Sequence, residues 1–161
     1  MGTGKSSVGR LVADSLQFEF VDMDEWIERK SGITIAEIFE KQGEPKFRTL
    51  EQEAVLDLAT RQNTVISAGG GVVANPENLA SLKTHALVVC LWASPEMIWE
   101  RVREQTHRPL LQTPDPLGKI RELLAKRDPF YRLADVLIQT DHRSPKEVAQ
   151  QVLIQFQSAR K

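Results

Sequence analysis

The stretch Met1-Gly2-Thr3-Gly4-Lys5-Ser6-Ser7 decides how the rest of the chain is interpreted. Gly4, Lys5 and Ser6 match the last three positions of the phosphate-binding pattern G-x-x-x-x-G-K-[ST]. The apolar residues at positions 8, 11, 12 and 16 then have helical spacing. A glycine-rich turn that opens a helix points backbone N–H groups and the helix dipole at an anion. We therefore predict a phosphate site in which Lys5 reaches the β- and γ-phosphates and the Ser6 hydroxyl binds Mg²⁺; the alternative is a flexible glycine-rich start.

The pattern is incomplete on its N-terminal side. Its first glycine would lie two residues before Met1, and the apolar strand that normally precedes such a loop is absent from the sequence. Two explanations remain open: a start codon assigned at an internal methionine of a longer protein, or a genuine truncation. For the chain as written we expect low stability.

Composition excludes several classes of protein. Of 161 residues, 41% are hydrophobic and 27% are charged, which is typical of a folded domain and argues against wholesale disorder. The one cysteine, Cys90, excludes an internal disulfide framework and a four-cysteine zinc site. A net charge of −1 argues against a nucleic-acid-binding protein, and no apolar run is long enough for a membrane span. Since no signal peptide opens the chain, we expect a cytoplasmic protein.

Predicted strands and helices alternate along the rest of the chain. We expect strands over 18–21, 64–68, 86–92 and 136–139, and helices over 24–30, 33–42, 94–104 and around 120–127, the last bent or ended at Asp128-Pro129. Further helices are expected to start at 43–45, 75–77 and 144–145, and residues 105–116 are expected to form a loop. This order predicts an α/β fold of three layers, α/β/α, around a central parallel sheet. Ligands of such sheets lie at the carboxyl ends of the strands, here Asp22, Gly69 and the segment after Gln139.

Two candidate sites follow strands directly. Asp22 and Asp24 stand two residues apart past the first strand, so Asp22 is predicted to hold a metal water opposite Ser6 and Asp24 to accept a hydrogen bond from a substrate hydroxyl. The alternative for Asp24 is that it caps the following helix. The triple glycine at 69–71 would let a ligand lie against the backbone, whereas a simple turn needs fewer glycines.

Arginines supply the other candidates. Arg48 lies beside an apolar helical stripe with Glu51 one turn later, an arrangement suited to a carboxylate or, alternatively, to a surface ion pair. Arg108 lies on the predicted loop, where an arginine can neutralise charge on phosphates, and Arg101, Arg127 and Arg143 are further basic candidates. The alternative for each is a solvated basic face.

Six segments occur in an order that resembles shikimate kinase, from Gly2 to the final helix. They are GTGKSSVGR (2–10), DMDEWIE (22–28), IFEKQGEPKFRTLE (38–51), GGGVV (69–73), RPLL (108–111) and RDPFYRLAD (127–135). The resemblance implies a P-loop kinase fold similar to nucleoside monophosphate kinases, in one domain over 1–161. It also implies a substrate-binding region over about 23–61 and a mobile lid over about 105–116. The implied reaction transfers the γ-phosphoryl group of ATP to the 3-hydroxyl of shikimate, in the pathway to chorismate and the aromatic amino acids.

The same resemblance implies a role for each matching position. Lys5, Asp24 and Arg108 would be catalytic, and Ser6 and Asp22 would hold Mg²⁺. The shikimate carboxylate would lie between Arg48 and Arg127, with the rest of its pocket formed by Asp24, Phe39, Phe47, Glu51, Gly69, Gly70 and Gly71. ATP would be bound by Gly2, Thr3, Gly4, Lys5, Ser6, Ser7 and Arg108, and its adenine end by Arg101, Arg143 and Pro145.

The chain departs from the family at its start, because the sequence lacks the strand that precedes the phosphate loop. In the family, that strand is central in the sheet. Two other classes of function therefore stay open. One is a different P-loop small-molecule kinase, of the gluconate or nucleotide type, and the other is a truncated, non-catalytic relic. We expect a monomer that binds a small molecule and neither nucleic acid nor a membrane.

Overall fold

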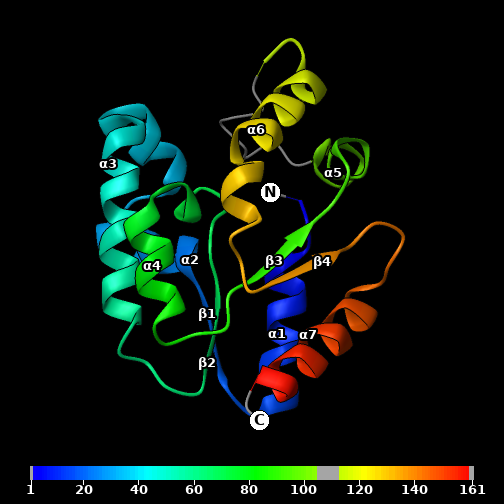
Figure 1. Cartoon of the computed structure of the whole chain (residues 1–161). Helices are drawn as coiled ribbons and strands as arrows, with labels where there is room; N and C mark the ends of the chain where they lie inside the picture. The colour runs from blue at the N-terminus through cyan, green and yellow to red at the C-terminus, as the bar shows by residue number, and fades with distance from the viewer. Residues whose placement is uncertain (1, 105–112, 160–161) are drawn as a thin grey trace.

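The computed structural model describes residues 2–104 and 113–159. Its strands are β1 (Glu19–Asp22), β2 (Thr64–Ser67), β3 (Val89–Trp92) and β4 (Val136–Gln139). Its α-helices are α1 (Lys5–Leu16), α2 (Met23–Ser31), α3 (Ile35–Leu58), α4 (Pro76–Lys83), α5 (Pro95–Val102), α6 (Pro116–Tyr131) and α7 (Pro145–Ala159), and a short 3₁₀ helix, η1, covers Val72–Ala74. The alternation of strands and helices predicted from the sequence is confirmed (Figure 1).

The strands form two parallel pairs. β1 pairs with β2 from Glu19↔Thr64 to Asp22↔Ser67, and β3 pairs with β4 from Val89↔Val136 to Trp92↔Gln139. The predicted parallel direction is therefore right, but the predicted single sheet is two separate two-stranded sheets among the described residues. The two pairs are held over a common helix, α1, instead of by a shared ladder. Val65 of β2 and Leu91 of β3 both pack against the cluster that contains Val8 and Val12.

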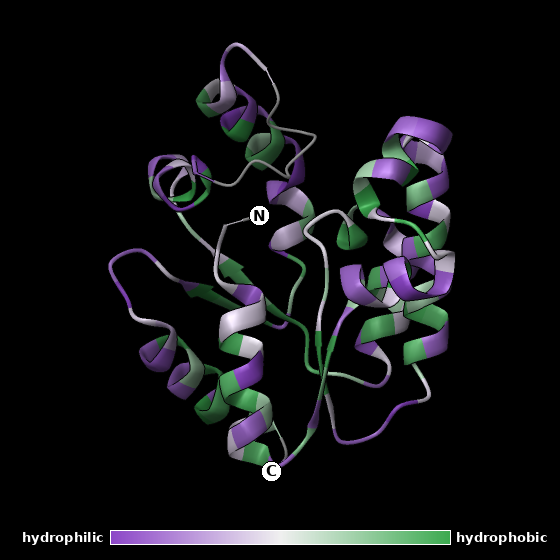
Figure 2. Cartoon of the chain, turned by 180° about the vertical axis from the view of Figure 1, so that it is seen from behind, coloured by the Kyte–Doolittle hydropathy of each residue, from purple (hydrophilic) through white to green (hydrophobic). Residues whose placement is uncertain are grey.

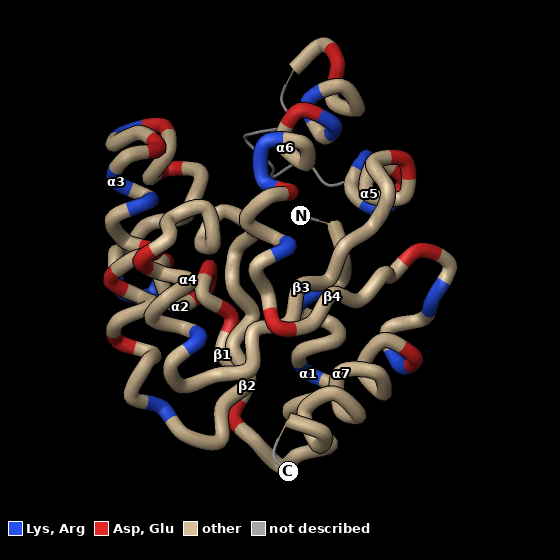
Figure 3. The backbone as a smooth tube through the Cα atoms, in the orientation of Figure 1, with Lys and Arg blue, Asp and Glu red and all other residues tan. Residues whose placement is uncertain are grey.

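Helices cover the strands in layers. On one side α1 and α7 pack against the strands, through a core that includes Val8, Val12, Ile138 and Val148. On the other side α2, α3 and α4 cover β1 and β2, where Val21, Ile27, Ile38 and Leu58 are among the buried residues. Figure 2 shows the resulting pattern, with largely hydrophobic strands and hydrophilic residues on the helices around them. Figure 3 shows acidic and basic residues interspersed along the chain.

Several element boundaries differ from those expected. The helices predicted on either side of Gly43 form one element, α3, kinked at Gly43, whose φ of 79° and ψ of 171° are non-helical. The helix predicted to bend or end at Asp128-Pro129 does not end there, because α6 runs on to Tyr131. Proline removes one N–H donor only, and the N–H of Arg132 still closes the last turn by donating to the Asp128 carbonyl. β3 starts at Val89, not 86, since the Ala86 N–H donates to Leu82 at the end of α4.

None of the helices in residues 2–104 and 113–159 has both the length and the apolar character that crossing a bilayer requires.

Candidate active site

The glycine-rich turn and the start of α1 form one end of the site. Gly4 is the N-cap of α1 with φ 85°, and Gly2 has φ 65°, so both adopt the left-handed conformation that glycine tolerates best. Arg101 of α5 anchors this turn. Its Nη1 donates to the Gly2 carbonyl at 3.3 Å and to Thr140 Oγ1 at 2.9 Å, and its Nη2 donates to the Thr140 carbonyl at 2.7 Å. The turn is thereby fixed with its N–H groups at the N-terminus of a helix, which favours an anion.

Three side-chain oxygens meet beside this turn. Ser6 Oγ donates to Asp22 Oδ2 at 2.6 Å and lies 3.3 Å from Ser67 Oγ. Hydroxyl and carboxylate oxygens are ligands that Mg²⁺ accepts, so the donor set fits that ion. The cluster falls short of a complete metal cage, because the described residues contain no group of three or more His, Cys, Asp or Glu side chains placed to hold a metal. Ser67 was not identified from the sequence, where a serine at a strand end carries no distinctive pattern.

Asp22 also settles the alternative raised for Asp24. The N-cap of α2 is Asp22, whose Oδ1 accepts the Asp24 N–H at 3.0 Å. Asp24 therefore lies in the first turn of the helix rather than at its cap, and its side chain points toward the glycine loop. A Cβ built on Gly69 would lie 3.7 Å from Asp24 Oδ1.

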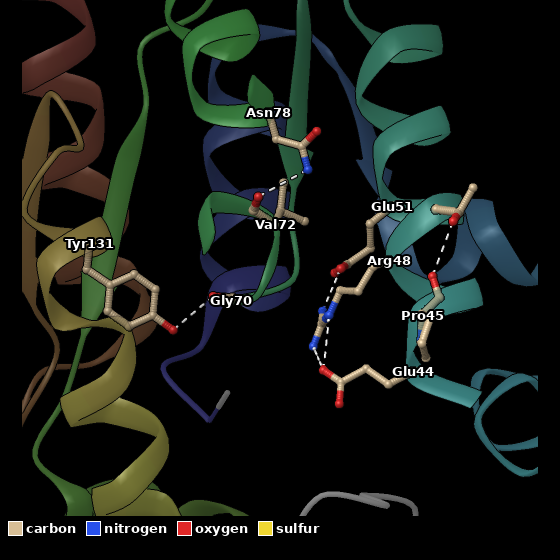
Figure 4. A network of polar contacts seen from close by, with 9 residues as sticks. Glu44, Pro45, Arg48, Glu51, Gly70, Val72, Asn78 and Tyr131 are labelled. Atoms are coloured by element: carbon tan, nitrogen blue, oxygen red, sulfur yellow. Dashed lines mark hydrogen bonds and ion pairs between the residues drawn. The ribbon is translucent and has the colours of Figure 1, made fainter. Parts of the chain in front are cut away.

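Arg48 lies between two carboxylates on α3 (Figure 4). Its Nη1 donates to Glu51 Oε2 at 2.5 Å, and its Nε and Nη2 donate to Glu44 Oε1 at 3.2 and 2.6 Å. Burial raises the pKa of Glu51 even though Arg48 opposes the shift. The hydrogen bond from Arg48 lowers the pKa of Glu44, which is exposed. Burial opposes the charge on Arg48, but its bonds to Glu51 and Glu44 raise its pKa. The surface ion pair considered for this motif is therefore excluded, since Glu51 is 2% exposed.

The triple glycine lies directly against this ion pair. A Cβ at Gly71 would overlap the Arg48 guanidinium, and one at Gly69 would lie 3.0 Å from Glu51 Oε1. Gly71 has φ −90°, a backbone conformation that any residue can adopt. Glycine is required there because the Arg48 guanidinium leaves no room for a side chain. The turn itself is closed by the Val72 N–H, which donates to the Gly69 carbonyl at 3.1 Å.

Arg127 approaches the same carboxylates from α6. Its positive charge favours the ionised form of both Glu44 and Glu51 and so acts to lower the pKa of each carboxyl. This effect of Arg127 is smaller than that of Arg48. One turn later on α6, the Tyr131 hydroxyl donates to the Gly70 carbonyl at 3.0 Å. Tyr131 was not proposed as a site residue from the sequence, although it lies in the segment RDPFYRLAD (127–135) that was singled out there.

Two phenylalanines border this region. The rings of Phe39 and Phe47 lie 4.9 Å apart between centroids, and the Arg48 guanidinium lies 5.3 Å from the centre of the Phe47 ring. Phe47, itself a residue of α3, is buried in the core between α3 and the strands β1 and β2.

Four more of the predicted residues can be placed in the structure. Arg143 Nη1 donates to Gln151 Oε1 at 2.7 Å, which turns its guanidinium toward α7. Pro145 is the first residue of that helix. Ser7 is exposed in the first turn of α1, and Thr3 is buried. Arg108 and residues 105–112 of the predicted lid lie outside the described residues.

Comparisons with known proteins agree on one family. The family model described as shikimate kinase matches residues 1–157. A shikimate kinase of Thermodesulfovibrio yellowstonii is 46% identical over 157 residues, covering 98% of this chain and 91% of its own. A structure described as shikimate kinase from Acinetobacter baumannii in complex with shikimate superposes with a TM-score of 0.94 at 41% identity, covering 99% of this chain and 89% of its own. A gluconokinase from Sinorhizobium meliloti reaches a TM-score of 0.59 at 19% identity, covering 93% and 83%, and so shares the fold alone.

Proposed function

This chain belongs to the shikimate kinase family, and we infer from that membership that it phosphorylates the 3-hydroxyl of shikimate with ATP. The observation that carries this conclusion is the identity of 46% over 98% of the chain with a shikimate kinase. The protein is accordingly a transferase of the biosynthetic route to aromatic amino acids. The side-chain arrangement supports a specific division of work between the two ends of the site.

We propose that the turn before α1 binds the phosphates of ATP. The backbone N–H groups at the α1 N-terminus and the Lys5 ammonium neutralise the phosphate oxygens, and Arg101 keeps the turn in place. Ser6 and Asp22 would hold Mg²⁺, which neutralises charge on the β- and γ-phosphates when it is bound. Arg143 and Pro145 remain our proposal for the adenine end, and Arg108 for a further contact with the phosphates.

The other end of the site is proposed to bind shikimate. Arg48 and Arg127 would hold its carboxylate from two helices, since an arginine fork matches a carboxylate bidentately. The ring would lie against the glycine loop and the wall formed by Phe39 and Phe47. Asp24, next to Gly69, would accept the hydrogen bond of the 3-hydroxyl and draw off its proton as the oxygen attacks the γ-phosphorus.

The carboxylate contact is tested by Arg48→Ala. We expect the shikimate KM to rise at least about tenfold, because removing one partner of a buried charge pair costs about 2–5 kcal/mol, while the KM for ATP stays near its original value. Arg61→Ala is the matched control. It removes an exposed guanidinium that bonds Glu19 at 2.8 Å. Wild-type shikimate kinetics in Arg48→Ala would show that the substrate carboxylate binds elsewhere.

The role of Asp24 is tested by Asp24→Asn, which keeps the shape and removes the charge. We expect kcat to fall by about a hundredfold or more, the usual size of a general-base effect, with little change in ATP binding. Glu25→Gln, the next residue along the chain, is the control because it also removes an exposed carboxylate from α2. A fully active Asp24→Asn enzyme would remove Asp24 from the chemistry.

An assay across acceptors separates this function from its alternatives. Turnover of gluconate or a nucleotide in preference to shikimate would indicate another P-loop kinase, and no turnover with any acceptor would indicate a non-catalytic relic.

We further propose that the protein works as a monomer in the cytoplasm, where ATP is supplied, and that the whole chain acts as one domain. Its substrate-binding region would cover about 23–61.

A further inference from the structure

Tyr131 contacts the substrate side of the site without belonging to any of the roles proposed above. It is the last residue of α6, and its hydroxyl donates to the Gly70 carbonyl at 3.0 Å, across 61 positions of sequence (Figure 4). Burial raises the pKa of the phenol, so it stays protonated and able to donate at neutral pH, although Arg127 acts in the opposite direction. Tyr131 is also the chain's one tyrosine.

The glycine loop that receives this hydrogen bond is confined on its opposite side. Gly71 lies against the Arg48 guanidinium, with no room for a Cβ between them, and Gly69 lies against Glu51 Oε1. Downstream, the buried Asn78 of α4 donates its Nδ2 to the Val72 carbonyl at 3.1 Å. A movement of the loop toward α3 would therefore displace the Arg48–Glu51 pair, and a movement away would leave that pair without support.

The second arginine of the proposed carboxylate site also acts on this phenol. Arg127 precedes Tyr131 by one helical turn, and its charge acts on the Tyr131 hydroxyl as well as on Glu44 and Glu51. One side chain thus ties the end of α6, which carries Arg127, to the loop that lies against Arg48.

We propose that Tyr131 is a positioning residue that sets the distance between the Arg48 and Arg127 sides of the shikimate-binding site by holding the Gly70 carbonyl. This inference rests on the proposed function. Tyr131 acts through the loop and through Arg127 rather than on a reacting atom. Its influence therefore belongs to shikimate binding and not to the transfer step or to ATP.

The test is Tyr131→Phe, which removes the hydroxyl and keeps the ring. We expect the shikimate KM, and the dissociation constant measured by calorimetry, to rise about three- to tenfold, the size expected when a hydrogen bond worth about 0.5–1.5 kcal/mol is lost. The turnover number and the ATP KM should stay within about twofold. Ser15→Ala is the control, because it removes a hydroxyl that bonds a backbone carbonyl at 2.8 Å on the exposed side of α1.

A double-mutant cycle identifies the route of the effect. If Tyr131 acts through the loop on Arg48, the loss of shikimate affinity in Tyr131→Phe combined with Arg48→Lys will be smaller than the sum of the two single losses. Additive losses, or a Tyr131→Phe enzyme that binds shikimate as the wild type does and only melts at a lower temperature, would overturn the positioning role while leaving the kinase function intact. A wild-type protein that neither binds nor phosphorylates shikimate would overturn both.

Discussion

At the scale of single residues, the site depends on a buried carboxylate, Glu51, that is paired with Arg48. Glu51 is 2% exposed and bonds Arg48 at 2.5 Å. Burial raises the pKa of such a carboxyl, and the hydrogen bond from Arg48 opposes that shift. Gly71 leaves the Arg48 guanidinium the space that this bond needs, since a Cβ there would overlap it. Removing one member of a buried pair typically costs about 3–5 kcal/mol, because the other charge is left buried without compensation.

Gly71→Ala tests the loop's approach to Arg48. The φ of −90° at Gly71 suits alanine, so the backbone should not be strained, but the new Cβ would overlap the guanidinium. We expect the shikimate KM to rise at least about tenfold, the consequence of losing a charge-assisted contact, with ATP binding little changed.

Gly32→Ala is the opposite case. Gly32 has φ 73° and nothing within 4 Å of a built Cβ, so the substitution strains the backbone and leaves the site alone. It should lower stability by about 1 kcal/mol without changing the shikimate KM. Equal effects of the two variants on KM would contradict the contact between Gly71 and Arg48 as the cause.

Sequence patterns anticipated some residue contacts and missed others for a physical reason. Ser6 and Asp22 were paired in advance, because a helix start and a strand end in a parallel α/β fold converge at one edge. Glu44 and Tyr131 were not assigned roles. Their contacts depend on the kink at Gly43 and on the continuation of α6 past Pro129, and neither is determined by local spacing.

At the scale of elements, α3 is the helix that positions the substrate end of the site. Its N-terminus carries a reciprocal cap, in which Thr34 Oγ1 accepts the Glu37 N–H at 3.2 Å and Glu37 Oε2 accepts the Thr34 N–H at 3.0 Å. Its second half, after Gly43, carries Phe47, Arg48 and Glu51. The sequence predicted both halves from their apolar spacing but treated them as two helices, since a Gly-x-Pro sequence usually separates elements.

The cap gives a pH-dependent prediction. Hydrogen bonds from Thr34 and Lys41 lower the pKa of Glu37 from 4.5 to about 2. A carboxyl whose folded pKa is depressed adds stability above its unfolded pKa and loses that contribution as the pH falls. The Tm difference between wild type and Glu37→Gln should therefore be largest near neutral pH and shrink between pH 4.5 and about 2. A Tm difference for Glu37→Gln that is independent of pH would disprove the charged cap.

At the scale of the whole molecule, the four described strands form two separate pairs. Within the described part of the chain, β2 pairs with β1 alone and β3 with β4 alone, so each pair has two edges that lack a neighbouring strand. β2 and β3 both pack on α1, through Val65 and Leu91. The layers and the parallel direction followed from the alternation of apolar strands and helices. The division into two sheets was not predicted. The distance between two strands depends on how the helices pack around them, and the residues of a single strand do not determine it.

This division predicts that one further strand would stabilise the molecule. An apolar segment of about five residues, fused through a glycine-bearing turn ahead of Met1, would run parallel to the others over Val8 and Val12 of α1 and offer backbone partners to β2 and β3. Each buried polar group left unpaired costs about 1–3 kcal/mol, against a total stability of about 5–15 kcal/mol. We therefore expect the extended chain to unfold at a higher temperature, and more cooperatively, than the 161-residue chain. A Gly-Ser extension of equal length is the control, because it adds chain without apolar side chains. If the apolar extension does not raise the melting temperature, or if the Gly-Ser extension raises it as much, the open strand edges are not what limits the stability of the chain.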